Sequence, residues 1–330
     1  MNSNYLRKNN LDLLRIISCV FVVLIHVSAT WIVKMQDRSI EPNFLISFLN
    51  SSSKFAVPVF FMLSGYFNIL NDKNSDIKAF WKKTFTKIIL PCLIFMIFYS
   101  FLKIFEGIVL KTEIKITFFE IFSGNLGALW FLYSLIPMYL VTPLVIILKK
   151  NISEKHFKYF CIIYFLYSIL SGIFSNYSVS WTLGNSADYF GFYLIGSIID
   201  NKRNEKVNSK YKIAIVVIIL ALLVINSCII YYYSFINKIS YDLSTNFNPI
   251  NVIISLLIFY LFSNISFKTN LNNFVKLTFP IYLIHPFIIS LCKLFLSKII
   301  LNYNIYLSFV IVYFIVLLFS VFLSYIYNIL

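Results

Sequence analysis

The sequence predicts an all-α integral membrane protein with about ten transmembrane helices and with both termini in the cytoplasm. Hydrophobic residues fill 60% of its 330 positions and charged residues only 12%, whereas a soluble domain carries about 25% charged residues. Apolar runs long enough to cross a bilayer recur along the whole chain. Lysine and arginine concentrate in alternate connecting segments, a pattern that fixes the orientation of a multi-pass protein.

Ten apolar runs are candidate spans, because a spanning helix needs about 20 mostly apolar residues. The first run is too long for a signal peptide, and no small-residue cleavage site follows it, so we expect it to remain as the first helix. The sixth run is short, and the fifth and eighth are near the lower limit of length. The runs are residues 11–33, 44–70, 88–110, 127–148, 157–174, 188–200, 213–236, 249–267, 277–299 and 305–330.

The distribution of basic residues sets the predicted orientation. With a cytoplasmic N-terminus, the inside segments hold 18 lysines and arginines and the outside loops hold six. Such an excess is the rule for cytoplasmic loops, so both termini are expected inside. The net charge of +15 is then mostly a consequence of topology, and no nucleic-acid partner is expected.

The whole chain, residues 1–330, is predicted to be one membrane domain without a separate soluble domain. The polar stretch 201–212 is a loop, and no internal repeat is found. The five cysteines lie singly in apolar runs, without the short spacings of a disulfide framework or a zinc site. No metal site is expected.

Three ionisable residues lie within the stretch LDLLRIISCVFVVLIH, residues 11 to 26. A charge near the centre of a bilayer costs about 2.5–3.5 kcal/mol on insertion scales, so such residues usually face the protein interior. Asp12 and Arg15 are neighbours on one helical face, where they can pair. Arg15 and His26 are separated by a helical offset of about 20° and a rise of roughly 16 Å. We expect both on one inward face, with Arg15 near the cytoplasm and His26 in the outer half.

Polar and helix-breaking residues also occur in the second run. Lys54 is placed at about the depth of His26, where it can serve the site or extend to the outer surface. Pro58 is expected to interrupt the helix inside the membrane. Ser64 and Gly65 are expected to allow close approach of a neighbouring helix.

The fourth and ninth runs contribute further candidates. Trp130 and Tyr133 are candidate substrate contacts near the outer end of the fourth run, and anchoring in the interfacial aromatic belt is the plainer explanation for both. His285 stands directly before Pro286 in the ninth run, where it can simply bond across helices beside a kink. Asp12 likewise has a plain role as a complement to the helix dipole.

Four fragments in order resemble the acyltransferase-3 family of multi-pass membrane proteins, and they extend from the first run to the ninth. The first fits that family's pattern of an arginine and a histidine separated by ten residues, at Arg15 and His26. The residues of the next fragment most resemble a shorter bacterial branch that acts on surface polysaccharides or cell-wall components, and they are similar to the membrane half of amino-acid racemases linked to glycopeptide resistance. The fragments are LDLLRIISCVFVVLIH (11–26), VPVFFMLSGYF (57–67), LGALWFLYSLIPMYLVTPLV (126–145) and FPIYLIHPF (279–287).

The resemblance implies transfer of an acyl group, usually acetyl, to a sugar hydroxyl at or beyond the outer surface of the bacterial cell membrane. The donor would be cytoplasmic acetyl-CoA or another acyl-CoA, and no permanently bound cofactor is implied. The partners would be the lipid bilayer and a glycan or lipid-linked sugar acceptor, and association into a homo-oligomer is left open.

Carried over position by position, the resemblance makes His26 the catalytic histidine and Arg15 its basic partner. A neutral imidazole can take a hydroxyl proton or accept the acyl group, and such help is worth roughly 10²–10⁴-fold. Arg15 suits the phosphates of coenzyme A. From its depth alone, Lys54 is expected to stabilise an oxyanion or to hold the imidazole neutral. The supporting residues expected around this pair are Asp12, Lys54, Tyr282 and His285.

One segment departs from the family pattern. Many members carry two arginines ahead of the proline that matches Pro91, whereas this chain has Lys82, Lys83 and Lys87 there. Lysines bind phosphate as point charges, so these three are weaker candidates for contacts with the donor. Positive-inside anchoring explains them equally well.

Two other classes of function fit the same features. A transporter or exporter of a polysaccharide or amino acid would also have proline-broken helices and buried ionisable residues, although such proteins often show inverted repeats. A sensor or partner subunit without activity of its own would tolerate substitution of Arg15 and His26.

Overall fold

The computed structural model describes residues 9–37, 39–111, 129–174, 185–199, 208–236, 245–265, 269–302 and 304–329. Within these ranges every regular element is helical, as the composition predicts. The elements are α1 (Asn9–Gln36), α2 (Phe44–Ser53), α3 (Ala56–Ile69), η1 (Asp72–Ser75), α4 (Ile77–Thr84), η2 (Phe85–Ile89), α5 (Leu90–Leu110), α7 (Trp130–Asn151), α8 (Glu154–Phe174), α9 (Asn185–Gly196), α10 (Ser209–Tyr231), η5 (Tyr232–Ile236), α11 (Pro249–Ser263), α12 (Asn272–Asn302) and α13 (Ile305–Ile329).

Eight helical segments of the described chain are long and apolar enough to cross a membrane. The prediction of an all-α integral membrane protein is therefore confirmed. The two remaining predicted spans are helical but shorter, because α9 has 12 residues and α11 has 15. A 12-residue helix rises roughly 18 Å, which is less than the ~30 Å hydrocarbon core. The short α9 packs against α3, α7 and α8 with nearly all its described side chains buried, so protein surrounds it instead of lipid.

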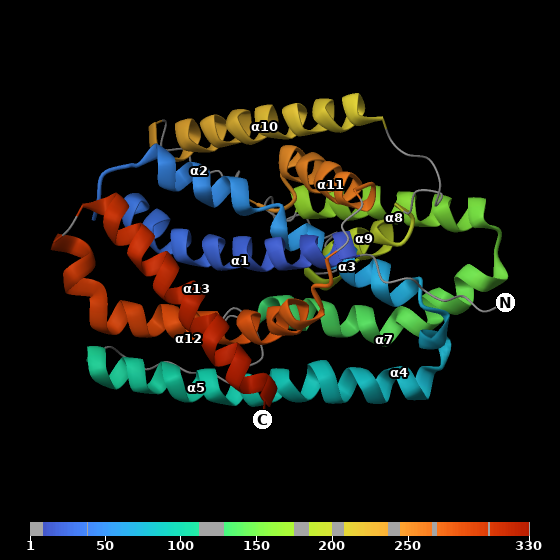
Figure 1. Ribbon diagram of the computed structural model, residues 1–330, viewed down its shortest axis with the longest axis horizontal. Coiled ribbons are helices and arrows are strands. Elements are labelled where there is room, and N and C mark those ends of the chain that lie inside the picture. Colours follow the sequence, from blue (N-terminus) through green and yellow to red (C-terminus); the bar gives the residue numbers. More distant parts are fainter. Residues whose placement is uncertain are drawn as a thin grey trace.

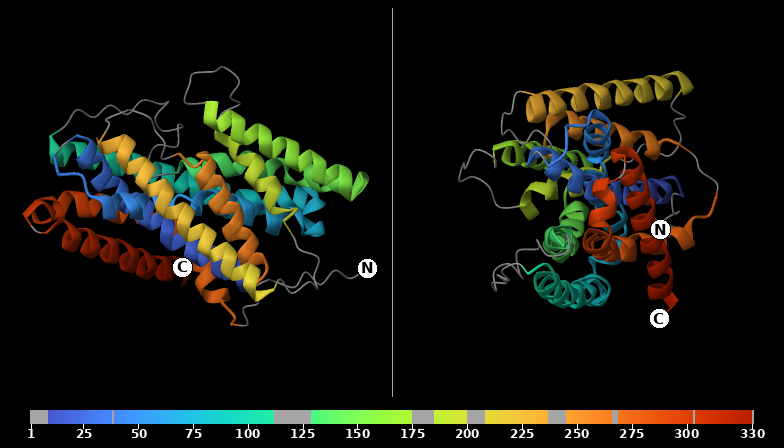
Figure 2. Two further views of the ribbon diagram at one scale, coloured as in Figure 1. Left: turned by 90° about the horizontal axis from the view of Figure 1, so that it is seen from above. Right: turned by 90° about the vertical axis from the view of Figure 1, so that its left-hand side faces the viewer.

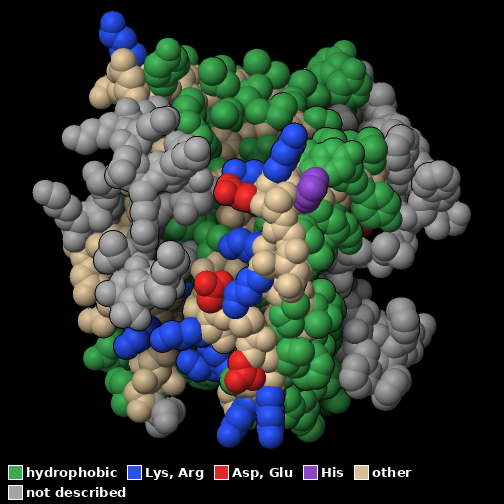
Figure 3. Space-filling model, turned by 90° about the vertical axis from the view of Figure 1, so that its right-hand side faces the viewer, with side chains coloured by type: hydrophobic (Ala, Val, Ile, Leu, Met, Phe, Trp, Pro, Cys, Tyr) green, Lys and Arg blue, Asp and Glu red, His purple; other side chains and the backbone are tan. Residues whose placement is uncertain are grey.

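The helices lie side by side in an elongated bundle and cross it in alternating directions (Figure 1). Helix α1 is central and contacts α2, α3, α11, α12 and α13. Helix α10 lies at the edge, against α2 and α11 (Figure 2). Lysine and arginine side chains gather on the end of the bundle at which α1 begins (Figure 3).

The second predicted span is broken one turn before its proline. The helix stops at Ser53, turns at Lys54 and Phe55, and resumes with α3 at Ala56. Pro58 therefore lies in the first turn of α3, where the missing N–H has no intrahelical acceptor to lose. The expectation for Pro58 agrees with this break, because a proline removes the hydrogen bond to the carbonyl four residues earlier, which here belongs to Lys54.

The third predicted span begins much earlier than residue 88. Helix α4, the π-helical turn η2 and α5 form one continuous helical segment from Ile77 to Val109, 33 residues long. Such a helix is roughly 50 Å long and exceeds the hydrocarbon core. The lysine-rich stretch before Pro91, which the hydropathy pattern places outside the span, is thus helical.

Buried polar side chains join α1 to α2 close to His26. Ser28 donates to the carbonyl of Leu24 at 2.6 Å, and Asn50 donates to Ser28 Oγ at 2.9 Å and to the carbonyl of Ile25 at 3.3 Å. Because these bonds engage the turn of α1 that carries His26, they fix that turn against α2.

Candidate active site

A cavity of about 610 Å³ opens into the bundle, and both Arg15 and His26 line it. Its walls come from α1, α3, η2, α5, α7, α12 and α13, so segments far apart in the sequence meet around it. Five lining residues have exposed side chains and therefore mark its mouth. These residues are Thr86, Lys87, Lys276, Tyr327 and Asn328.

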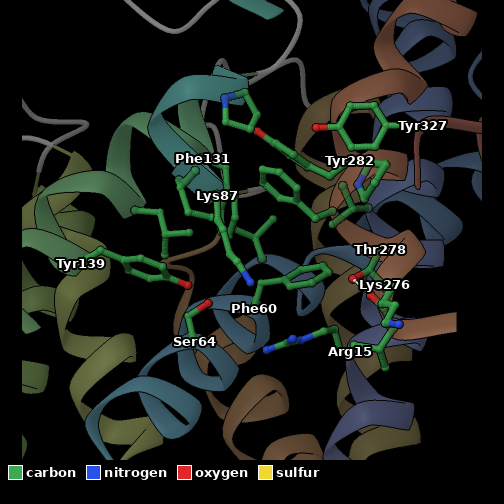
Figure 4. Close-up of a pocket in the computed structure, with 18 of the residues that line it drawn as sticks. Arg15, Phe60, Ser64, Lys87, Phe131, Tyr139, Lys276, Thr278, Tyr282 and Tyr327 are labelled. Carbon is green, nitrogen blue, oxygen red and sulfur yellow. Dashed lines mark hydrogen bonds between the residues drawn. The ribbon is translucent and has the colours of Figure 1, made fainter. Parts of the chain in front are cut away.

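Cationic side chains stand at and just inside the mouth. The guanidinium carbon of Arg15 lies 4.7 Å from the centre of the Phe67 ring, a cation–π contact that holds its head in place. Figure 4 shows Arg15 and Lys87 pointing into the cavity, where the hydroxyls of Ser64 and Tyr139 also point. Lys276 lies on the wall beside Arg15 and Thr278. Cations and hydroxyls in this arrangement suit a phosphate-bearing ligand.

Lys87 lies within the π-helical turn η2, which supplies part of the cavity wall. A π turn inserts one extra residue and rotates the helix that follows, and such turns are frequent at functional sites. Lys82 and Lys83 precede the turn on α4 and do not line the cavity, and the ammonium of Lys83 lies over the Phe80 ring at 6.0 Å. Of the three lysines predicted for the donor, the structure places only Lys87 with Arg15.

A pair of histidines lies deeper in the bundle. The rings of His26 and His285 have centroids 5.0 Å apart and planes tilted by 46°. His26 lines the cavity, whereas His285 is fully buried behind it. His26 is thus the imidazole that a bound molecule can touch.

Aromatic side chains form much of the wall near His26. Trp130 and Tyr282 both line the cavity, and Tyr282 packs against the His285 ring with centroids 5.9 Å apart. Tyr133, one turn after Trp130 on α7, packs beside Cys92 and Tyr99 of α5 and lies outside the cavity lining. The structure therefore brings Trp130, but not Tyr133, to the cavity.

Lys54 and Asp12 flank the cavity without lining it. Lys54 lies at the break between α2 and α3, close enough for its charge to act on His26, and Lys293 of α12 does the same. Asp12 is buried in the first turns of α1, where it shares the helix with Arg15. The pairing of Asp12 with Arg15 remains a prediction.

Several cavity residues are not among the site residues that the sequence predicts. The sequence predicts Lys276 only as one of the basic residues that set the orientation, and it predicts Ser64 only as a site of close helix packing. Tyr139, Thr278 and Asn328 give no signal, because only the tertiary fold brings α7, α12 and α13 around one space.

The fold and the cavity define a class: a multi-pass helical membrane protein with a buried chamber that is lined by a histidine and opens past cations. Within this class, the chain belongs to the acyltransferase-3 family, since the family model described as an acyltransferase domain matches residues 8–329. It is a membrane acyltransferase. Comparison with curated proteins and with solved structures finds no match.

Proposed function

We propose that this protein is a membrane O-acyltransferase that moves an acyl group, acetyl in the simplest case, from cytoplasmic acyl-CoA to a hydroxyl of an extracytoplasmic glycan. The observation that carries the proposal is a single cavity with cations at its mouth and His26 within it. One chamber that reaches both groups lets a donor enter from the basic end of the bundle and present its thioester to the imidazole. The acceptor class and a bacterial plasma-membrane location are part of the proposal.

The donor's phosphates are assigned to the mouth of the cavity. Arg15 offers planar paired N–H donors that match two phosphate oxygens at once, and Lys87 and Lys276 add point charges. The apolar side chains of Phe60, Phe131 and Trp130 in the cavity wall suit the flexible arm that joins the phosphates to the thioester.

The chemical step is assigned to His26. Its imidazole takes the proton of the acceptor hydroxyl while the hydroxyl oxygen attacks the thioester carbonyl carbon. The carbon–sulfur bond then breaks, an ester forms, and the proton passes from His26 to the departing thiolate. Atoms and charge balance without a metal or a redox partner.

The test is transfer of labelled acetyl from acetyl-CoA to glycan in inverted membrane vesicles. We expect His26→Ala to lower the rate by about 10²–10⁴-fold, because the proton acceptor is lost. His156→Ala is the matched control, since this exposed histidine lies on α8 at the basic end and outside the cavity, and it should keep the wild-type rate.

Two outcomes would contradict the proposal. Labelled glycan formed at the wild-type rate by a correctly inserted His26→Ala protein would exclude the catalytic role of His26. Movement of a glycan across proteoliposomes without any acyl donor would favour the transporter alternative.

A further inference from the structure

Helix α12 continues through Pro286, but its ladder of backbone hydrogen bonds lacks one donor there. Pro286 has no N–H, so the carbonyl of Tyr282, four residues earlier, lacks its normal helical donor. Pro280 stands one and a half turns before in the same helix. A helix with two internal prolines is free to bend at this turn unless other groups hold it.

Tyr99 of α5 contacts the interrupted turn with its hydroxyl. The hydroxyl donates to the carbonyl of Leu283 at 2.6 Å and accepts from the N–H of Phe287 at 3.2 Å. These two backbone groups are four residues apart, so the hydroxyl contacts both ends of one helical turn. Tyr99 is buried, so its hydroxyl is a fixed bridge across the turn.

The same turn sets the protonation of His285. Its Nδ1 lies 3.1 Å from the carbonyl of Ile281, and the carbonyl of Tyr282 also acts on the ring. A carbonyl only accepts, so Nδ1 carries the proton. Among the described residues, Nε2 of His285 is buried and has no hydrogen-bond partner, and the ring stands beside His26.

We propose that Tyr99 is a positioning residue: by bridging the turn that Pro286 interrupts, it holds His285 in its Nδ1–H form against His26. Tyr99 acts through the backbone of α12, and His285 in turn confines the His26 ring from behind. The inference rests on the proposed function only where it links this geometry to turnover.

A spectroscopic test does not depend on the activity. The chain has three histidines, so ¹⁵N-histidine labelling in nanodiscs gives few signals, and His285→Gln and His156→Gln assign them. We expect protonated Nδ1 and unprotonated Nε2 for His285 in the wild type, and a mixture of the two tautomers in Tyr99→Phe. A wild-type His285 with its proton on Nε2, or unchanged nitrogen shifts in Tyr99→Phe, would overturn the proposal.

A kinetic test separates positioning from general stability. Displacement of a catalytic group by 1 Å costs about 10²-fold, so Tyr99→Phe should lower kcat roughly tenfold or more with KM for the donor unchanged. Tyr193→Phe is the matched control, because Tyr193 is a buried tyrosine whose hydroxyl bonds Thr142 at 2.6 Å, away from α12. It should keep kcat within about twofold of wild type. Equal losses of kcat in Tyr99→Phe and Tyr193→Phe would mean that Tyr99 contributes only to packing.

A third test restores the backbone N–H at position 286 and asks whether this recovers the kcat lost in Tyr99→Phe. Pro286→Ala gives Tyr282 its donor back and lets the turn close as an ordinary helix. The double variant Tyr99→Phe/Pro286→Ala is therefore expected to regain part of the kcat lost in Tyr99→Phe. If the two substitutions lowered kcat by strictly additive amounts of free energy, the bridging role of Tyr99 would be contradicted. If His26→Ala proved fully active, the proposed catalytic role of His26 would fail, whereas the tautomer measurement would still decide the role of Tyr99.

Discussion

Lys82 and Lys87 are five residues apart on one helical segment, yet only Lys87 lines the cavity. Five residues turn an α-helix by about 140°, so the two side chains point to different sides of the segment, and the sequence alone does not reveal which side faces the cavity. Topological and functional lysines have the same composition, so the two roles separate only when the backbone is known.

The first residue-scale prediction compares these two lysines. Lys87→Ala should raise KM for acyl-CoA about tenfold with little change in kcat, because a charge that binds the donor's phosphates contributes equally before and during reaction. Lys82→Ala removes the same charge outside the cavity and should leave KM near the wild-type value. Initial rates over a range of acyl-CoA concentrations measure both, and equal effects of the two variants would argue for a general surface potential.

At the same scale, the sequence predicts that Arg15 and His26 lie on one face of α1, and both line the cavity, because their relation depends only on helix geometry. Eleven residues on a straight helix return to nearly the same face whatever surrounds them. Lys276 and Tyr99 could not be predicted, since their roles depend on which helix packs against which. His285 is predicted as a supporting residue, and its position behind His26 follows only from the packing of α12 on α1.

At the scale of elements, two glycines permit the contact of α3 with α9. A Cβ on Gly65 would overlap the carbonyl oxygen of Tyr193, and a Cβ on Gly196 would overlap that of Met62. The expectation that Gly65 permits close helix approach is confirmed. Close backbone approach at small residues is a main source of helix association in membranes.

Gly65→Ala is therefore expected to destabilise the protein by about 1–3 kcal/mol, because the obstructing atom is backbone and cannot rotate away. Leu220→Ala is a suitable control, since that side chain lies exposed on α10 and its loss opens no internal space. Thermal unfolding in detergent should show a lower midpoint for Gly65→Ala only. An unchanged midpoint would mean that α9 can move away from α3 without penalty.

The element boundaries show what a hydropathy pattern leaves out. Each of the ten apolar runs falls on a helical segment of the described chain, and the break at Lys54 and Phe55 has no sequence signal other than the proline that follows it. The extension of α4 through the lysine-rich stretch escapes prediction for a related reason. Polar residues end a membrane span without ending a helix, because the backbone bonds continue into water.

At the scale of the whole molecule, the alternating direction of the helices brings the basic segments to one end of the bundle (Figure 3). The charge count along the chain predicts this separation, although it carries no information about which helices become neighbours. The helix order around α1, and hence the cavity, is decided by packing.

The orientation of that bundle in the membrane is testable with introduced cysteines. Ser39→Cys lies between α1 and α2, and Ser209→Cys begins α10 at the other end. In a Cys228→Ser background, which removes the exposed native cysteine, an impermeant maleimide should label Ser39→Cys in intact cells. Ser209→Cys should react only after permeabilisation, since the basic end is cytoplasmic. The reverse pattern would invert the predicted orientation.

In the proposed reaction, the axial rise of roughly 16 Å between Arg15 and His26 along α1 sets how far the acyl group of a donor must lie from its phosphates. A donor whose anionic head is held by the guanidinium and whose carbonyl carbon meets the imidazole needs a slender spacer of that reach between them. Acetyl phosphate, in which the phosphate adjoins the acyl group, is too short to satisfy both ends. If the proposed donor site is right, donors would be selected by their length as well as by their chemistry, and acetyl phosphate is expected not to replace acyl-CoA.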